Sequence, residues 1–273
     1  MKIIPIQMVL STALALSATA AFAQTAAPAV PAAAASPWSY NLTLASNYKF
    51  RGQDQDQSKT RAFKPALQGG VDYAFDNGFY LGNWNSTINW TKYATPSQNS
   101  AVEVDLYGGY KFKAGEIDLD VGALQYYYPG ATNSNTTEIY FGAGYGPVSA
   151  KYSSTVSKGY FGIGSPGATG TPAGSGRGTG YLNLAFAKEI MPKITFKAAL
   201  GFTNYSKSVT STSYPNYSDY NVGASYDLGD GLAVSGAFVG ANKKSNYTFP
   251  TSVDTTGKSV NKNTLVVMLT KTL

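Results

Sequence analysis

Hydrophobic and polar residues alternate along most of the chain from Trp38 to the C-terminus. An alternation with period two is typical of β-strands that have one apolar and one polar face. No stretch shows a convincing helical period, so the pattern predicts an all-β fold. We predict twelve strands, at 38–51, 66–75, 79–90, 102–112, 117–128, 137–145, 148–156, 180–190, 193–203, 217–228, 232–240 and 263–273.

The connections between the predicted strands alternate between short and long. Along the chain, tight turns such as Asp76-Asn77-Gly78 alternate with longer polar loops, with one predicted strand between each turn and the next loop. Bacterial outer-membrane barrels have short turns at one end and long loops at the other, whereas a soluble sandwich has no reason to segregate them. We therefore predict a single 12-stranded antiparallel transmembrane β-barrel, an up-and-down meander over residues 38–273. The alternative is an exported soluble β protein with an ordinary core.

Strand length and aromatic residues agree with a membrane barrel. Ten residues at ~3.3 Å each, tilted by ~40°, span roughly 25 Å, which is the height of the apolar band in such barrels. Aromatic residues are expected in a girdle at each membrane interface. On the apolar faces we assign Tyr40, Phe75, Tyr80, Phe112, Tyr145 and Tyr226 to the inner rim, and Phe50, Trp90, Tyr127 and Tyr220 to the outer rim.

The N-terminus has the three parts of an export signal. Lys2 precedes a short apolar core at 8–18, and Ala21-Phe22-Ala23 is an A-x-A cleavage site. We predict a signal peptide at 1–23. Residues 24–37 are almost all Ala, Pro, Thr and Val and are predicted to form a periplasmic tether.

Composition removes many enzyme classes. The chain has no cysteine and no histidine, so it has no Ser-His-Asp triad, thiolate nucleophile or imidazole metal ligand. We expect no enzyme activity, no catalytic residue, no cofactor and no metal. The absence of a basic run of five to eight residues argues against nucleic acid as a partner.

Several runs resemble a known family. These are Ser46-Asn47-Tyr48-Lys49-Phe50-Arg51-Gly52, the segment 65–90, Leu106-Tyr107-Gly108-Gly109-Tyr110, and Tyr127-Tyr128-Pro129-Gly130 followed by Glu138-Ile139-Tyr140. They are similar to the TorF family of porins of Gram-negative bacteria. The similarity covers nearly all of the chain after the signal peptide and is strongest over 38–160. It implies an outer-membrane barrel with a channel role, and it assigns neither a solute nor functional residues.

Twelve charged residues fall on the polar faces of the strands and are predicted to line a pore. If the apolar faces meet lipid, the polar faces point into the lumen. The acids come mostly from the second to sixth strands, and the bases mostly from the first, seventh and ninth. Opposed walls would set a transverse field across the lumen, whereas direct pairing would close it with salt bridges. The set is Lys49, Arg51, Asp72, Glu103, Asp105, Lys111, Asp118, Asp120, Glu138, Lys151, Lys197 and Asp219.

Pairs of acids on one strand face allow other chemistry. The pairs Glu103/Asp105 and Asp118/Asp120 could serve in acid–base catalysis or bind Ca²⁺, although a polar lumen wall explains them as well. The predicted outer loops carry eleven Lys and Arg residues against three Asp residues. This excess would attract anionic solutes or neutralise lipopolysaccharide phosphates.

The number of strands limits the function. Eight strands leave a filled interior and sixteen to eighteen an open channel, so twelve predict a narrow one. We expect a porin-like outer-membrane channel for passive diffusion of small hydrophilic solutes or ions, with membrane lipid and lipopolysaccharide as its surroundings. The alternative is a closed structural or adhesive barrel without transport activity.

Overall fold

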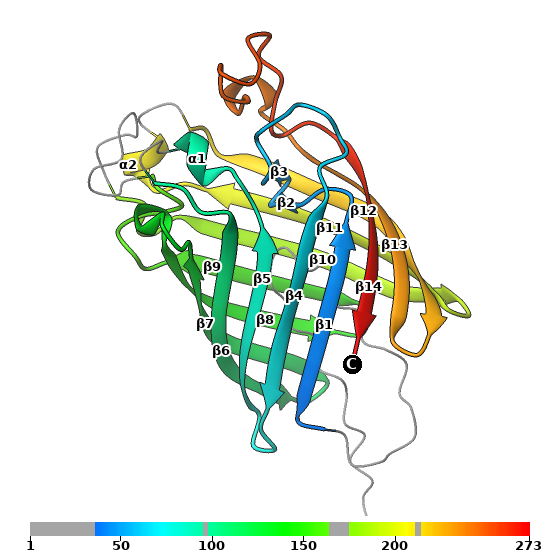
Figure 1. Cartoon of the computed structure of the whole chain (residues 1–273). Helices are drawn as coiled ribbons and strands as arrows, with labels where there is room; N and C mark the ends of the chain where they lie inside the picture. The colour runs from blue at the N-terminus through cyan, green and yellow to red at the C-terminus, as the bar shows by residue number, and fades with distance from the viewer. Residues whose placement is uncertain (1–35, 95–97, 164–174, 211–213) are drawn as a thin grey trace, which may run out of the picture.

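Twelve long strands close into an antiparallel barrel, as the sequence predicts (Figure 1). The computed structural model describes residues 36–94, 98–163, 175–210 and 214–273. The predicted signal peptide at 1–23, and the tether at 24–37 except its last two residues, lie outside this part of the chain. Their assignment stays a prediction.

Each barrel strand pairs with its neighbours in sequence, and β1 closes the ring by pairing with both β4 and β14. Leu44 of β1 lies opposite Leu67 of β4 on one side and Leu269 of β14 on the other. The barrel strands are β1 (Trp38–Ala45), β4 (Ala66–Ala74), β5 (Phe79–Thr87), β6 (Val102–Ala114), β7 (Ile117–Tyr127), β8 (Thr136–Tyr145), β9 (Val148–Thr155), β10 (Gly180–Met191), β11 (Ile194–Asn204), β12 (Tyr217–Gly229), β13 (Leu232–Ala241) and β14 (Thr264–Thr272).

Long and short connections lie at opposite ends of the barrel (Figure 1). The long connections hold the short helices α1 (Thr91–Ala94) and α2 (Lys207–Thr210) and two single 3₁₀ turns. The first long connection contains the hairpin strands β2 (Lys49–Phe50) and β3 (Gln53–Asp54). Among the described residues, no helix is long and apolar enough to cross a bilayer.

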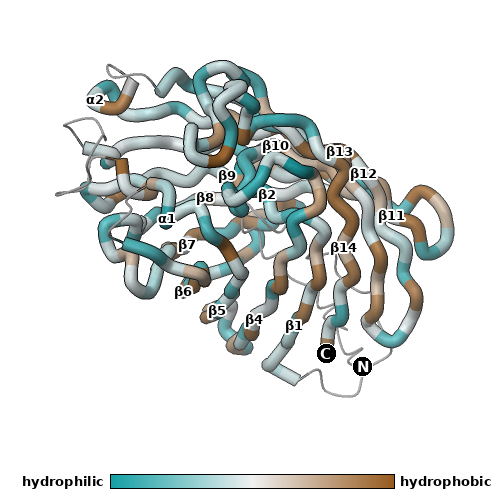
Figure 2. The backbone as a smooth tube through the Cα atoms, turned by 45° about the horizontal axis from the view of Figure 1, so that its top comes forward, coloured by the Kyte–Doolittle hydropathy of each residue, from teal (hydrophilic) through white to brown (hydrophobic). Residues whose placement is uncertain are grey.

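The outer face of the barrel is apolar. Leu67, Leu106, Leu200 and Leu265 are each more than half exposed. Figure 2 shows hydrophobic residues along β13 and β14. A monomeric soluble protein rarely exposes a contiguous apolar surface of this extent, so this face is built to meet another apolar phase.

One strand has its faces reversed relative to the prediction. Tyr80 of β5 was assigned to the outward face, but it is buried inside the barrel together with Trp84, and Phe79 and Leu81 point outward instead. Both faces of this strand carry large apolar residues, so the alternation alone cannot fix its phase.

Two outer-rim assignments are also wrong. The strand predicted at 38–51 ends at Ala45, and the strand predicted at 79–90 ends at Thr87. Phe50 and Trp90 therefore leave the wall and are buried among other aromatic rings rather than exposed to lipid. Phe50 packs against Tyr126 with ring centroids 5.6 Å apart.

Tyrosine side chains inside the barrel lie against glycines of neighbouring strands. A Cβ on Gly82 would collide with the ring of Tyr107, and a Cβ on Gly122 would collide with Tyr140. Glycine thus leaves room for each ring to lie along the wall instead of standing out into the lumen.

Candidate functional site

The first part of the first long connection, residues 46–55, folds into the barrel, whereas most of residues 58–63 are exposed. We call residues 46–65 the inward loop. Its strands β2 and β3 pair only with each other and form a separate two-stranded sheet near the end of the barrel that carries the long connections (Figure 1). The side chains of Tyr48, Phe50 and Arg51 are all buried. The structure thus places Lys49 and Arg51, predicted as part of a wall strand, in a loop within the lumen.

The turn of the hairpin requires glycine at its second position. Arg51 and Gly52 have positive φ angles of 47° and 78°, a region that side chains with a Cβ disfavour. A Cβ on residue 52 would also lie 2.7 Å from the Cβ of Asp219 and 2.8 Å from that of Ala241. The tip of the inward loop is therefore in close contact with β12 and β13.

On the other side of the lumen, the inward loop binds acids of the wall. The Tyr48 hydroxyl donates a hydrogen bond of 2.6 Å to Glu103 of β6. The Arg51 guanidinium donates hydrogen bonds of 2.7 and 3.0 Å to the two carboxylate oxygens of Glu138 in β8. Both members of this ion pair are 1% exposed. Two of the predicted lumen charges thus neutralise each other directly.

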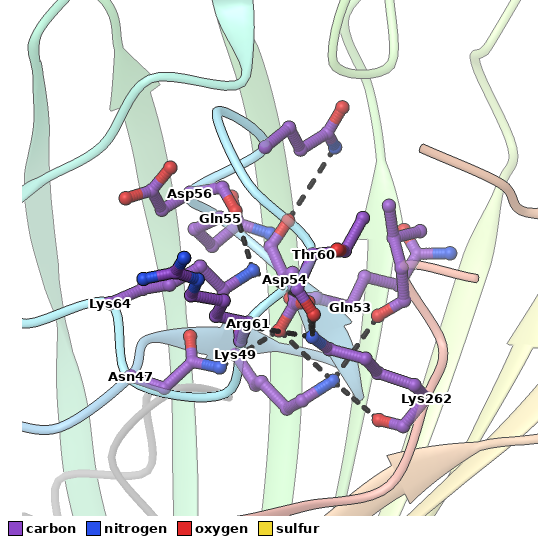
Figure 3. Close-up of polar contacts among 12 residues, drawn as sticks. Asn47, Lys49, Gln53, Asp54, Gln55, Asp56, Thr60, Arg61, Lys64 and Lys262 are labelled. Carbon is purple, nitrogen blue, oxygen red and sulfur yellow. Dashed lines mark hydrogen bonds and ion pairs between the residues drawn. The ribbon is translucent and has the colours of Figure 1, made fainter. Parts of the chain in front are cut away.

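Three lysines surround one carboxylate at the base of the hairpin (Figure 3). The oxygens of Asp54 lie 3.2 Å from Lys49 Nζ, 2.7 Å from Lys64 Nζ and 3.7 Å from Lys262 Nζ. The Asn47 amide donates a further hydrogen bond of 3.0 Å to Asp54. Because Lys262 belongs to the last long connection, the cluster ties the inward loop to a segment about two hundred residues away.

Burial sets the electrostatics of this cluster. It lowers the pKa of Lys49 to about 8, and the neighbouring Asp54 carboxylate opposes the shift. Burial also lowers the pKa of Lys64, again opposed by Asp54. The Asp54 carboxylate, together with backbone carbonyls that accept hydrogen bonds from Lys49 and Lys64, makes the burial of these two lysines tolerable.

Other acids of the predicted set bind tyrosine hydroxyls. Tyr107 donates a hydrogen bond of 2.6 Å to Asp72, and Tyr80 donates one of 2.8 Å to Asp120. Tyr181 donates a hydrogen bond of 3.2 Å to Asp219. The wall therefore supplies neutral donors to its acids.

Two of the wall lysines lie over aromatic rings. Lys111 Nζ is 4.6 Å from the ring centroid of Tyr80, and Lys151 Nζ is 3.8 Å from that of Tyr140. At such distances a cation is attracted to the face of the ring. With Lys49 and Arg51 in the inward loop and Lys111 on β6 beside the acids, the predicted opposed acidic and basic walls do not form.

The remaining predicted residues differ in their surroundings. Asp105 and Lys197 are buried inside the barrel. Asp118 is instead exposed near the end with the short turns and forms a 2.5 Å ion pair with Lys113. The acid pair Asp118/Asp120 is thus split between the rim and the interior. Within the described residues, no group of three or more Asp or Glu side chains could hold a metal ion.

The sequence prediction missed the aromatic contacts that hold the inward loop. Tyr48 packs on Trp84 at 5.6 Å, and Phe50 packs on Phe161 at 5.2 Å. The hydroxyl oxygen of Tyr160, next to Phe161, accepts a hydrogen bond of 3.0 Å from the Arg51 guanidinium. A cluster of aromatic residues at the ends of predicted strands was the available signal, but it was interpreted as a membrane girdle.

The closed ring of twelve antiparallel strands with a loop folded inside defines a porin-type barrel. The chain belongs to the family described as bacterial protein of unknown function (Gcw_chp), which it matches over residues 30–273. No curated protein matches the chain.

Among solved structures, the chain is similar to two porins. It is 9% identical to the KdgM porin, with a TM-score of 0.50, and the match covers 85% of this chain and 98% of that one. It is 8% identical to the NanC porin, with a TM-score of 0.51, covering 85% and 97%. At these identities the likeness shows the fold alone.

Proposed function

We propose that this protein is an outer-membrane channel for passive diffusion of small hydrophilic solutes or ions. The observation that carries the proposal is a closed barrel with an apolar outer face and charged side chains inside. Lipid can contact the apolar outer face, and water can reach the charged side chains inside only along the barrel axis. The porin-type fold and the resemblance to TorF-family porins support the same function.

We assign the pore lining to the charged residues of the predicted set that lie on the inner wall. Four of these residues lie on one side of the ring, between β4 and β9: Asp72 on β4, Lys111 on β6, Asp120 on β7 and Lys151 on β9. A polar solute could exchange hydration water for these groups and the tyrosine hydroxyls beside them. Glu103, Asp105, Glu138, Lys197 and Asp219 complete the wall.

The proposed location is the outer membrane of a Gram-negative bacterium, reached through the signal peptide at 1–23. The basic outer loops, including exposed Lys92 and Arg177, would face the lipopolysaccharide phosphates. Such contacts at an interface are favourable because they pair opposite charges outside the hydrocarbon region.

A closed structural barrel is the second candidate function. The observation that favours it is the inward loop, because the buried Arg51–Glu138 pair joins this loop to the wall across the lumen. A barrel closed in this way throughout its life would conduct nothing.

Single-channel recording separates the two functions. The protein without its predicted signal peptide is refolded, checked by heat-modifiable gel mobility and inserted in a planar bilayer under a KCl gradient. Discrete conductance steps support the channel. A change in reversal potential with Asp120→Asn, and a much smaller one with exposed Asp118→Asn, supports the assigned lining. Correctly folded protein that never conducts would overturn the channel proposal.

A further inference from the structure

We infer that the inward loop, residues 46–65, is a displaceable gate, and that the Arg51–Glu138 ion pair is the latch that holds it closed. This inference rests on the proposed channel function and adds to it the element that controls the opening. It follows from the position of the loop in the lumen, from its attachment to the barrel through side chains, and from the free-energy cost of removing one member of the ion pair.

The loop spans the whole lumen. Tyr48 is bonded to Glu103 of β6, and Gly52, four residues later, lies against Asp219 of β12. In the ring order, β6 and β12 are six strands apart in both directions and so face each other. Twelve strands ~4.8 Å apart and tilted by ~40° give a barrel with a backbone diameter of roughly 24 Å. The side chains that point inward occupy about half of this diameter, and the other half is the width of the lumen. A two-stranded hairpin with its side chains is about as wide as that space.

The loop is attached to the barrel by side chains rather than by a strand ladder. Its strands β2 and β3 pair with each other and with no barrel strand. The backbone bonds from the hairpin to other segments include Asp54 N–H to Val260 O at 3.1 Å and Asn89 N–H to Gln55 O at 3.1 Å. The hairpin can therefore leave the lumen while every ladder of the barrel stays intact. Local opening of this kind uses only the interactions of the segment that moves.

Arg51 carries the side-chain attachment at the tip of the loop. Its guanidinium forms the ion pair with Glu138, contacts the Tyr160 hydroxyl at 3.0 Å and lies 4.2 Å from the ring centroid of Tyr181. The residue adopts φ = 47°, which is unfavourable for a side chain with a Cβ. The side-chain contacts of Arg51 thus stabilise a backbone conformation that would otherwise relax.

Loss of either partner should open the gate. Arg51→Gln takes the hydrogen-bonded counter-charge from the buried Glu138 carboxylate in the closed state, and Glu138→Gln takes it from the buried Arg51 guanidinium. In the open state water solvates whichever charge remains. Breaking a buried pair in this way should raise the ratio of open to closed channels by roughly a hundredfold or more.

The two variants change the lumen charge in opposite directions, which makes the test specific. A residue that acts only through the field of the pore would shift ion selectivity one way for Arg51→Gln and the other way for Glu138→Gln. A latch moves the open probability upward in both. The double variant, which leaves no unpaired charge, should open less than the sum of the two single effects predicts.

The experiment is single-channel recording of the wild type, both single variants and the double variant, each checked for folding by heat-modifiable mobility. Arg177→Gln, which removes an exposed arginine, is the matched control and should behave as the wild type. Higher open probability in both single variants supports the latch. Unchanged open probability, with opposite shifts in reversal potential, overturns it while leaving the channel function standing.

A reversible lock tests the movement of the loop directly. The chain has no cysteine, so Gln53→Cys with Asn261→Cys introduces the only thiols, at side chains that share a 3.0 Å hydrogen bond. After crosslinking with a short thiol-specific reagent, verified by mass spectrometry, the channel should stay closed and reopen on reduction. A crosslinked protein that conducts as the reduced form does would overturn the gate but not the channel. Silence of the wild type and all unlocked variants would overturn both.

Discussion

The Asp54→Asn substitution should release the base of the inward loop. Asp54 is fully buried between Lys49 and Lys64, whose side chains are at most 1% exposed, with Lys262 at 3.7 Å. Asparagine keeps the shape and removes the charge, so Lys49 and Lys64 stay buried without the carboxylate between them.

The magnitude follows from what is left unpaired. Removal of one partner from a buried ion pair costs about 3–5 kcal/mol, because the remaining charge keeps its desolvation penalty. The penalty applies only while the lysines stay buried, so it destabilises the closed loop and not the barrel. The open fraction should rise roughly 200- to 5,000-fold.

Thiol labelling measures this fraction without disturbing the barrel. Gln55→Cys places a single thiol at a buried position of the loop, and a membrane-impermeant maleimide reacts with it only when the loop opens. When opening is fast compared with labelling, the labelling rate is proportional to the open fraction. Asp118→Asn, which breaks the exposed pair with Lys113, is the control and should not change the rate. Equal labelling of Asp54→Asn and the parent would refute the reasoning.

Three further predictions concern the loop tip, pH and the lipid face. Gly52→Ala should accelerate labelling more than Gly115→Ala, since both glycines have positive φ but only residue 52 lacks room for a Cβ; equal rates would contradict this. The pKa of Lys49 is about 8 in the closed loop and about 10.4 in water, so the open loop binds more protons above about pH 7. The open fraction should therefore fall roughly tenfold from about pH 7 to about pH 9. It is measured as the labelling rate of the loop thiol relative to that of an exposed thiol. A rise over that interval would be inconsistent with the closed-loop value. Leu200→Lys on the outer face should reduce the free energy of unfolding in lipid vesicles by about 2–4 kcal/mol, and inward-facing Ser225→Lys by less, as urea titrations would show.

The barrel could be predicted from sequence because lipid imposes a strict rule on every strand. Outward positions such as Leu67, Leu200 and Leu265 must be apolar, whereas inward positions are free to be polar, so the phase and number of most strands follow from the alternation. The rule fails for β5, where Tyr80 and Trp84 compete with Phe79 and Leu81. There the two faces are about equally apolar, and contacts inside the barrel, of Trp84 with Tyr48 and of Tyr80 with Asp120, favour the observed phase.

The inward loop could not be predicted, because its local pattern is that of a strand. Residues 46–51 continue the alternation of β1, and a hairpin inside a barrel has the same period as a strand in its wall. The sequence identified Arg51 and Glu138 as inward charges, but they are 87 residues apart. Which charge pairs with which is decided by the curvature of the whole ring, and no short window contains that information.

The tyrosines that lie against glycines of the next strand link the two most unusual features of the composition, 29 Gly and 21 Tyr. Each such ring, as in Tyr107 over Gly82, occupies the space a neighbouring side chain would have filled. The bore of the barrel is therefore set by pairs of positions rather than by single residues. In related chains the two positions should covary: a larger residue in place of the glycine should accompany a smaller one in place of the tyrosine, and a mismatch would mark a lineage whose bore has changed.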